Sequence, residues 1–140
     1  MTEHNQDVIP EGWSPFEVKS HYSQSIAPMY VRRDPPGLAF LANEGHSNLN
    51  GVVHGGALAT LADISLFVLA TGGNSAMNGA TLSLNMNYLR PGRLGQFIHA
   101  EGRIVREGSS IIFVEGSLLA GSEELITFNG VIKRFRSRES

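Results

Sequence analysis

The chain has 140 residues, of which 41% are hydrophobic and 17% are charged, a composition typical of one globular domain rather than of a disordered chain. Its formal net charge of −2 creates no strong field that would attract nucleic acid or an anionic membrane. The absence of cysteine excludes a disulfide scaffold, a thiolate zinc site and a cysteine nucleophile.

The N-terminal segment is polar at its start and gives a mixed pattern further on. It has neither the basic stretch nor the apolar stretch of a secretory signal, so we expect a cytoplasmic protein. Residues 13–29 suit a short helix or an irregular cover. We therefore divide the chain into a partly flexible cover segment (residues 1–30), one domain (residues 31–136) and a flexible tail (residues 137–140).

Turn and strand signals precede the longest apolar stretch. Residues 30–33 suit a strand end or a loop, residues 34–37 (DPPG) predict a turn, and residues 38–42 predict a strand. Over residues 57–70, apolar residues occupy nearly every helical position, which predicts a helix buried on all sides. The glycines at positions 72 and 73 predict its end. This stretch is too short and too polar to span a membrane.

Four strands are predicted after residue 79, at residues 80–89, 97–105, 110–119 and 125–135. The first alternates in character, with Leu82, Leu84, Met86 and Tyr88 on one face and Thr81, Ser83, Asn85 and Asn87 on the other. The connections at residues 106–109 and 120–123 are short enough for hairpins, which join antiparallel strands. Strands separate from one long helix indicate an α+β fold, with an antiparallel sheet curled around the helix together with a second chain.

Asp63 is the only charged residue between Gly51 and Arg90, and it lies in the middle of the predicted helix. Burying an unpaired carboxylate costs several kcal/mol, so a buried acid often marks a site of chemistry. We interpret Asp63 as a general base or nucleophile in a pocket of low dielectric. The alternative is that Asp63 faces solvent or a groove, or bonds to a nearby hydroxyl such as that of Thr60.

The tripeptide His54-Gly55-Gly56 opens the same helix. The first amides of a helix lack intrahelical acceptors, and glycine lets a ligand approach them closely, which suits an oxygen that gains negative charge during acyl transfer. The alternative is a simple turn into the helix. Gly55 and Asp63 lie about 12 Å apart along one helix, whereas one acyl carbon needs both groups within about 3–4 Å. A dimer in which Gly55 of one chain faces Asp63 of the other satisfies this requirement.

Residues 46–56 (HSNLNGVVHGG), followed by Asp63, and residues 81–91 (TLSLNMNYLRP) resemble the hot-dog fold acyl-CoA thioesterases of the PaaI type. The resemblance covers about residues 38–135. It implies an antiparallel sheet wrapped around one long central helix, with dimerisation through the sheet and often a dimer of dimers. It also implies hydrolysis of an acyl- or aryl-CoA thioester to a free acid and CoA. No cofactor is expected, because CoA is part of the substrate. The net charge and the apolar pattern described above give no reason to expect a nucleic acid or membrane partner.

The resemblance gives a catalytic role to four positions of this chain. Asp63 matches the acid that activates water or attacks the thioester, and Gly55 matches the helix-start amide that polarises the thioester carbonyl. Asn48 matches an asparagine that assists at the carbonyl or orients water. Thr81 matches a hydroxyl position across the subunit interface that helps to place the water.

The CoA moiety needs cations and backbone donors. The substrate-binding candidates are His54, Gly56, Arg90, Arg106, Gly108, Ser109 and Ser110. For His54 we expect a structural or orienting role before a catalytic one, and a surface arginine more often faces solvent than binds a ligand. The histidines show no metal-ligand spacing, so no metal site is expected.

Two other functions stay open at this stage. A dehydratase or hydratase acting on an acyl thioester would use the same fold, but those relatives carry a catalytic histidine and none lies on the predicted helix. A non-catalytic acyl-CoA binding module would keep the pocket and lack the acid, or add a DNA-binding segment. Because Asp63 is present, thioester hydrolysis is the main hypothesis.

Overall fold

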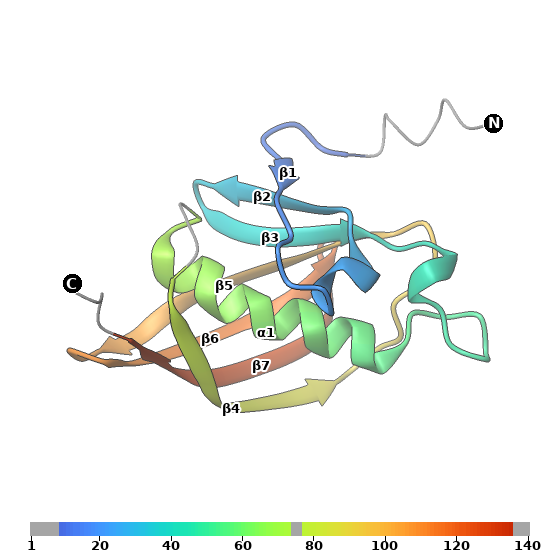
Figure 1. Cartoon of the computed structure of the whole chain (residues 1–140). Coiled ribbons are helices and arrows are strands. Elements are labelled where there is room, and N and C mark those ends of the chain that lie inside the picture. The colour runs from blue at the N-terminus through green and yellow to red at the C-terminus, as the bar shows by residue number, and fades with distance from the viewer. Residues whose placement is uncertain (1–8, 74–76, 136–140) are drawn as a thin grey trace.

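A computed structural model describes residues 9–73 and 77–135, so the predicted tail and the first eight residues of the cover segment lie outside the described residues. Within these ranges, one α-helix packs on a seven-stranded antiparallel sheet (Figure 1). The elements are β1 (Ser14–Phe16), η2 (Ser23–Ile26), β2 (Met29–Arg33), β3 (Pro36–Leu41), η3 (Glu44–His46), α1 (Gly55–Thr71), β4 (Gly79–Tyr88), β5 (Phe97–Glu107), β6 (Ile111–Ala120) and β7 (Glu123–Arg134). The predicted α+β architecture with one long helix is confirmed.

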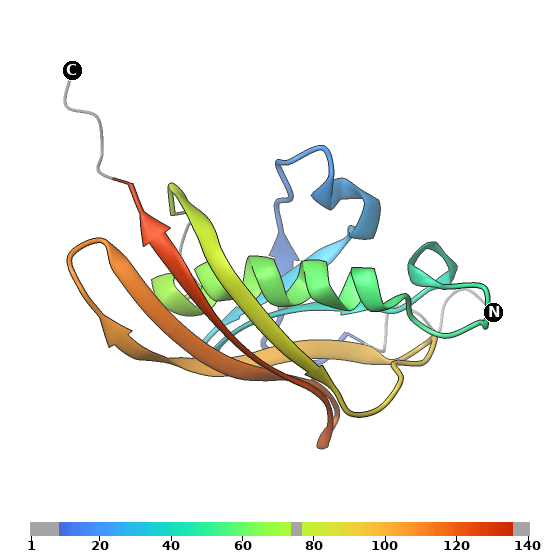
Figure 2. The same cartoon turned by 90° about the horizontal axis from the view of Figure 1, so that it is seen from below.

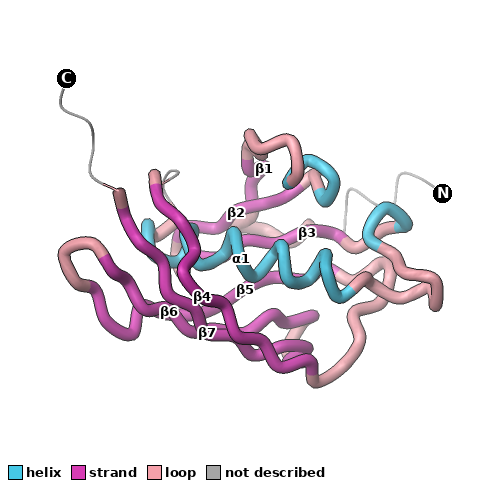
Figure 3. Tube along the Cα trace, turned by 60° about the horizontal axis from the view of Figure 1, so that its bottom comes forward, coloured by secondary structure: helices cyan, strands magenta, loops and turns pink. Residues whose placement is uncertain are grey.

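The strand order of the sheet is β1-β2-β3-β5-β6-β7-β4. The four strands predicted after residue 79 are all present, with ends within two residues of the prediction, and the two predicted hairpins join β5 to β6 and β6 to β7. β4 does not pair with β5, which follows it in sequence, but with β7, and it forms one edge of the sheet. The edge strand therefore lies beside the last strand of the chain (Figure 3).

Part of the predicted cover segment belongs to the sheet. β1 pairs with β2, and β2 pairs with β3, so residues 30–33 form a strand rather than a loop. The short helix expected within residues 13–29 is the 3-10 helix η2. β1 has three residues, too few to show an alternating pattern in the sequence.

The ends of α1 follow from local capping. His54 is the N-cap residue, and its imidazole Nδ1 accepts a hydrogen bond from the backbone N–H of Gly56 at 2.8 Å. The helix ends at Gly72, which adopts the left-handed conformation with φ of 70°. Among the described residues, none of the helices combines the length and the apolar character needed to cross a bilayer.

The expectation that α1 is buried on all sides is wrong for the single chain. The residues packed against the sheet are buried, namely Ala57, Leu58, Leu61, Ala62, Ser65, Leu66, Val68 and Leu69. The opposite stripe is half-buried, and it includes Thr60, Asp63, Ile64 and Phe67. Figure 2 shows the reason, because the sheet curves around one side of α1 only.

Candidate active site

The loop that leads into α1 is held in place by a buried histidine. The ring of His46 stacks on Phe40, with 4.1 Å between the ring centroids. Its Nδ1 accepts from the backbone N–H of Asn43 at 3.0 Å, and its Nε2 lies 3.0 Å from the carbonyl oxygen of Ile26. The carbonyl oxygen of His46 accepts from the backbone N–H of His54 at 2.6 Å. These contacts of His46 fix the position at which α1 begins.

The first turn of α1 leaves one backbone donor unused. The N–H groups of Ala57 and Leu58 both donate to the carbonyl oxygen of His54, at 2.9 and 3.2 Å, and the N–H of Gly56 donates to the His54 side chain. The described residues provide no hydrogen-bond acceptor for the N–H of Gly55. At the positive end of the helix dipole, this N–H is therefore free to bind a negatively charged oxygen.

Asp63 is half-buried, and its carboxylate Oδ1 accepts a hydrogen bond from the Thr81 hydroxyl at 2.7 Å. The hydroxyl considered as an alternative partner, that of Thr60, instead donates to the carbonyl oxygen of Gly56 at 2.9 Å. Thr81 and the carboxylate that it contacts belong to the same chain. The alternation of β4 predicts Thr81 on the face opposite to Leu84 and Met86, and this is wrong. Thr81 faces α1, because a register shift between Thr81 and Ser83 interrupts the alternation.

Leu82, at this irregularity in β4, is half-exposed, whereas Leu84 and Met86, predicted on the same face, are partly buried against the core. Bulges of this kind often aim a side chain at a functional site. Here the irregularity places the Thr81 hydroxyl on the carboxylate of α1. The described residues contain no group of three or more potential metal ligands, counting histidine, aspartate and glutamate, near Asp63 or elsewhere.

Asn48 closes the tight loop before α1. Its side-chain Oδ1 accepts from the backbone N–H groups of Asn50 and Val52, at 2.8 and 3.3 Å. Its side-chain nitrogen has no hydrogen-bond partner among the described residues. Asn48 and His54 line the same hollow, so the Asn48 amide group lies at the helix-start end of α1.

Tyr88 belongs to this end of the molecule as well, and the sequence reasoning missed it. Its phenol donates a hydrogen bond to the carbonyl oxygen of Gly55 at 2.7 Å. Burial raises the pKa of the Tyr88 phenol above its ordinary value of 10.0. The alternation in residues 80–89 places Tyr88 on the helix-facing side with Leu84 and Met86, and this signal was sufficient to select it.

The predicted substrate-binding residues fall into two groups at opposite ends of the sheet. Arg90 lies at the start of α1, in a hollow of about 280 Å³ that Gly55 and Tyr88 also line. Arg90 there donates from Nη1 to the carbonyl oxygen of Glu124 at 2.9 Å. The β5–β6 hairpin, residues 108–110, lies at the far end of the sheet, as Figures 1 and 2 show.

The hairpin offers fewer phosphate donors than expected. The N–H of Gly108 donates to the carbonyl oxygen of Ile111 at 2.8 Å and is therefore used within the turn. The N–H groups of Ser109 and Ser110 have no acceptor among the described residues. Arg106 is exposed and makes no ion pair or hydrogen bond with the part of the chain that the structure describes.

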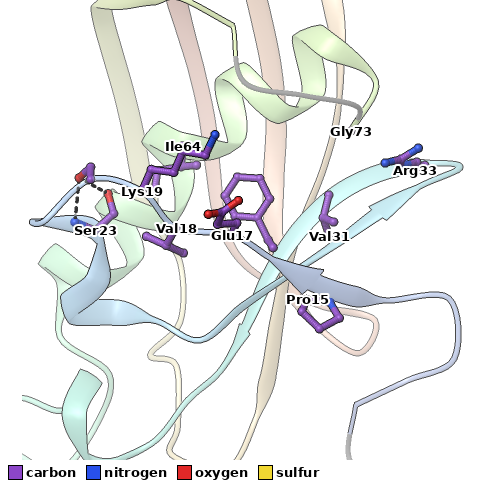
Figure 4. A pocket seen from close by; sticks show the side chains of 11 residues that line it. Pro15, Glu17, Val18, Lys19, Ser23, Val31, Arg33, Ile64 and Gly73 are labelled. Carbon is purple, nitrogen blue, oxygen red and sulfur yellow. Dashed lines mark hydrogen bonds between the residues drawn. The ribbon is translucent and has the colours of Figure 1, made fainter.

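A hollow of about 470 Å³ lies between the N-terminal segment, β2 and α1 (Figure 4). Phe16, Val18, Val31 and Ile64 give it apolar walls, and the charged side chains of Glu17, Lys19 and Arg33 also line it. Ile64 directly follows Asp63 in α1, so the hollow adjoins the half-buried stripe that carries the carboxylate.

The chain is similar to known proteins both in sequence and in structure. The chain is similar to the candidate esterase PA0474 of Pseudomonas aeruginosa, with 27% identity over 88% of this chain and 95% of that protein. It is also 33% identical to human acyl-coenzyme A thioesterase 13 over 54% of this chain, and it matches about half of that protein's length. Among solved structures, the BH2602 protein of Bacillus halodurans, crystallised with CoA, superposes with a TM-score of 0.71 at 25% identity, over 88% of this chain and 83% of that one.

The shared fold confirms the predicted hot-dog architecture, since BH2602 superposes on most of the chain. The family model described as the thioesterase superfamily matches residues 50–127, which include Gly55, Asp63, Thr81 and Tyr88. This match spans more than half of the 140 residues. The chain therefore belongs to the thioesterase superfamily, and the predicted class of enzyme, a thioester hydrolase, is confirmed.

Proposed function

We propose that the chain hydrolyses acyl-CoA thioesters, with Asp63 as general base or nucleophile and the Gly55 N–H as donor to the oxyanion. The observation that carries the proposal is the pairing of a half-buried carboxylate, oriented by Thr81, with an unused N–H at the start of the same helix. As a base, Asp63 takes a proton from water while the water oxygen bonds to the carbonyl carbon. The oxyanion then collapses, the carbon–sulfur bond breaks, and CoA leaves as the thiolate.

The two groups act on one carbonyl only if they come from two chains. They are eight residues apart on α1, which corresponds to about 12 Å along the axis. The half-buried stripe of α1 and the edge strand β4 are the surfaces that a second copy would cover. The active unit is thus a homodimer. The resemblance to PaaI-type thioesterases supports dimerisation through the sheet and assembly as a dimer of dimers. Asn48, at the helix start, assists at the carbonyl or orients the water.

The CoA part of the substrate is the part best supported by comparison, because BH2602 was crystallised with CoA and human acyl-coenzyme A thioesterase 13 is named for its action on acyl-CoA. Arg90 and His54 line hollows at the helix start and bind CoA there in one subunit. Gly56, in the first turn of α1, also binds it. Arg106 with residues 108–110 binds it at the far end of the other. The apolar hollow in Figure 4 takes the acyl group, with the N-terminal segment as one wall. The cytoplasmic location expected from the sequence stays a prediction.

Thiol release from a panel of acyl-CoA thioesters tests the proposal. Short, medium, long-chain and aryl acyl-CoA substrates are incubated with the protein, and free CoA is measured with a thiol reagent. We expect turnover of at least one class, together with release of the free acid. An enoyl product without free thiol would identify a dehydratase, and tight binding without turnover would identify a binding module; both outcomes would contradict the proposal.

Thr81→Val is expected to lower kcat by about tenfold, because it removes a hydrogen bond to a charged group while it keeps the side-chain shape. The measurement is steady-state hydrolysis of the best acyl-CoA of the panel. Thr127→Val is the matched control, since that hydroxyl lies on β7 and contacts Asn87 rather than Asp63. An equal loss in both variants would mean that the Thr81 hydroxyl has no special role.

A further inference from the structure

The peptide unit between Gly55 and Gly56 is hydrogen-bonded at both ends. Its carbonyl oxygen accepts from the Tyr88 phenol at 2.7 Å. Its N–H donates to Nδ1 of His54 at 2.8 Å. A peptide unit is planar, so two bonds at its opposite ends fix both its position and its orientation.

The neighbouring peptide unit, between His54 and Gly55, is held at one end only. Its carbonyl oxygen accepts from the N–H groups of Ala57 and Leu58 at 2.9 and 3.2 Å. Its N–H, which belongs to Gly55, is the unused donor of the first turn among the described residues. The other three polar groups of these two peptide units are thus hydrogen-bonded. Their hydrogen bonds hold the two peptide units in place and so determine the direction of the free Gly55 N–H.

Strand pairing and backbone hydrogen bonds hold the Tyr88 backbone in place. It pairs with Ile126 at the end of β4, and the next two residues, Leu89 and Arg90, both donate from the backbone to the carbonyl oxygen of Leu125, at 2.8 and 3.2 Å. Its ring lies directly over the glycine, because a Cβ atom placed on Gly55 would be 3.4 Å from the ring and 3.6 Å from the phenol oxygen. The space between the ring and the Gly55 backbone would thus accept a Cβ atom in ordinary van der Waals contact, and the direct link between Tyr88 and the helix start is the hydrogen bond of the phenol.

We infer that Tyr88 is a positioning residue for the oxyanion donor, acting through the Gly55 carbonyl to hold the Gly55 N–H in its productive direction. This inference rests on the proposed function, because it requires that the Gly55 N–H binds the thioester oxygen. In this role Tyr88 acts through the Gly55 backbone and not on a reacting atom. Its contribution is realised when charge develops on the oxygen, so it affects kcat rather than substrate affinity.

The protonation state of Tyr88 agrees with this role. Only the protonated phenol can donate to a carbonyl oxygen. Because burial raises the pKa of the phenol above 10.0, the group keeps its proton throughout the neutral range. The bond to Gly55 is therefore present at every pH at which acyl-CoA hydrolysis is normally assayed.

Tyr88→Phe removes the phenol oxygen and leaves the ring in place. We expect kcat for acyl-CoA hydrolysis to fall about tenfold, with KM within about twofold of the wild-type value. The inhibition constant of a thioether analogue of the substrate, which has no thioester carbonyl, stays unchanged. Tyr30→Phe is the matched control, because Tyr30 lies on β2 and its ring is near Phe97 of β5, away from the start of α1. Its kcat and KM are expected to equal those of the wild type.

The experiment begins with the wild type and an Asp63 variant, so that failure of the proposed function is recognised separately, as an inactive wild type or a fully active Asp63 variant. With those two behaving as proposed, a wild-type kcat in Tyr88→Phe overturns the inference, as does a loss that falls on KM and on analogue binding. If Tyr88→Phe unfolds, 4-aminophenylalanine at position 88, which keeps a donor at the same end of the ring, is expected to restore most of kcat. Absence of this rescue in a folded variant also overturns the inference.

Discussion

Asp63→Asn is expected to lower kcat for acyl-CoA hydrolysis by about 10²–10⁴-fold, the contribution usual for a general base. The asparagine amide can neither take a proton from water nor attack the carbonyl carbon. The change is nearly isosteric. In the wild type the Thr81 hydroxyl lies 2.7 Å from the carboxylate, and in the variant it still donates to the amide oxygen. The variant should therefore fold and assemble like the wild type, and the loss should appear in activity alone.

The measurement is steady-state thiol release, with circular dichroism and size-exclusion chromatography as checks of fold and assembly. Asp34→Asn is the matched control. Asp34 is exposed in the turn between β2 and β3, and it is remote in sequence from α1 and from the loop that leads into it. It makes the same chemical change and should leave kcat unaltered. Wild-type turnover by Asp63→Asn would remove Asp63 from the mechanism altogether.

A single turnover in isotopically labelled water distinguishes the two roles of Asp63. If the carboxylate attacks the thioester, an anhydride forms and its hydrolysis can leave the label in Asp63. If the carboxylate activates water, the label goes only to the released acid. Asp63→Asn loses activity in both cases, so the labelling experiment is needed to decide between nucleophile and base.

Most of the fold follows from signals local in the sequence. The glycines at positions 72 and 73 mark the end of α1, and the short connections around residues 108 and 121 mark the two hairpins. The site follows in the same way, because Asp63 is the single acid in a long apolar stretch and Gly55 stands at the helix start. Each of these features is set by neighbours within a few residues in the chain.

The features that sequence reasoning missed depend on contacts between distant segments. β4 pairs with β7 although some 40 residues separate them, and no local signal sets that choice. The irregularity at Leu82 turns Thr81 toward α1, which an alternating pattern cannot show. The sequence placed Tyr88 on the same strand face as Leu84 and Met86, but its bond to Gly55 requires knowing that β4 ends beside the start of the helix.

The second large expected effect concerns the stability of the packing between α1 and the sheet. This packing requires a glycine at position 130, where Leu66 of the helix meets β7. A Cβ atom at Gly130 on β7 would lie 2.6 and 2.9 Å from the two methyl groups of Leu66, which is fully buried. Leu66→Ala is expected to lower the free energy of unfolding by about 2–5 kcal/mol, because it leaves a cavity. Gly130→Ala is expected to lower it by about 1–3 kcal/mol, because it overpacks the same contact.

The double variant Leu66→Ala/Gly130→Ala should lose less than the sum of the single losses, by about 1 kcal/mol, since the new methyl group occupies part of the space that Leu66 leaves. Recovery stays partial because the new Cβ also lies 2.9 Å from the backbone oxygen of Ser83. Urea denaturation monitored by circular dichroism gives the four free energies. Leu58→Ala combined with Gly130→Ala is the control, because Leu58 lies about 12 Å along α1 from Leu66 and its loss should simply add. Additive losses in the Leu66 pair would show that the contact between Leu66 and Gly130 does not determine the packing of α1 on the sheet. The position of Asp63 beside Thr81 would then depend on other contacts of the helix.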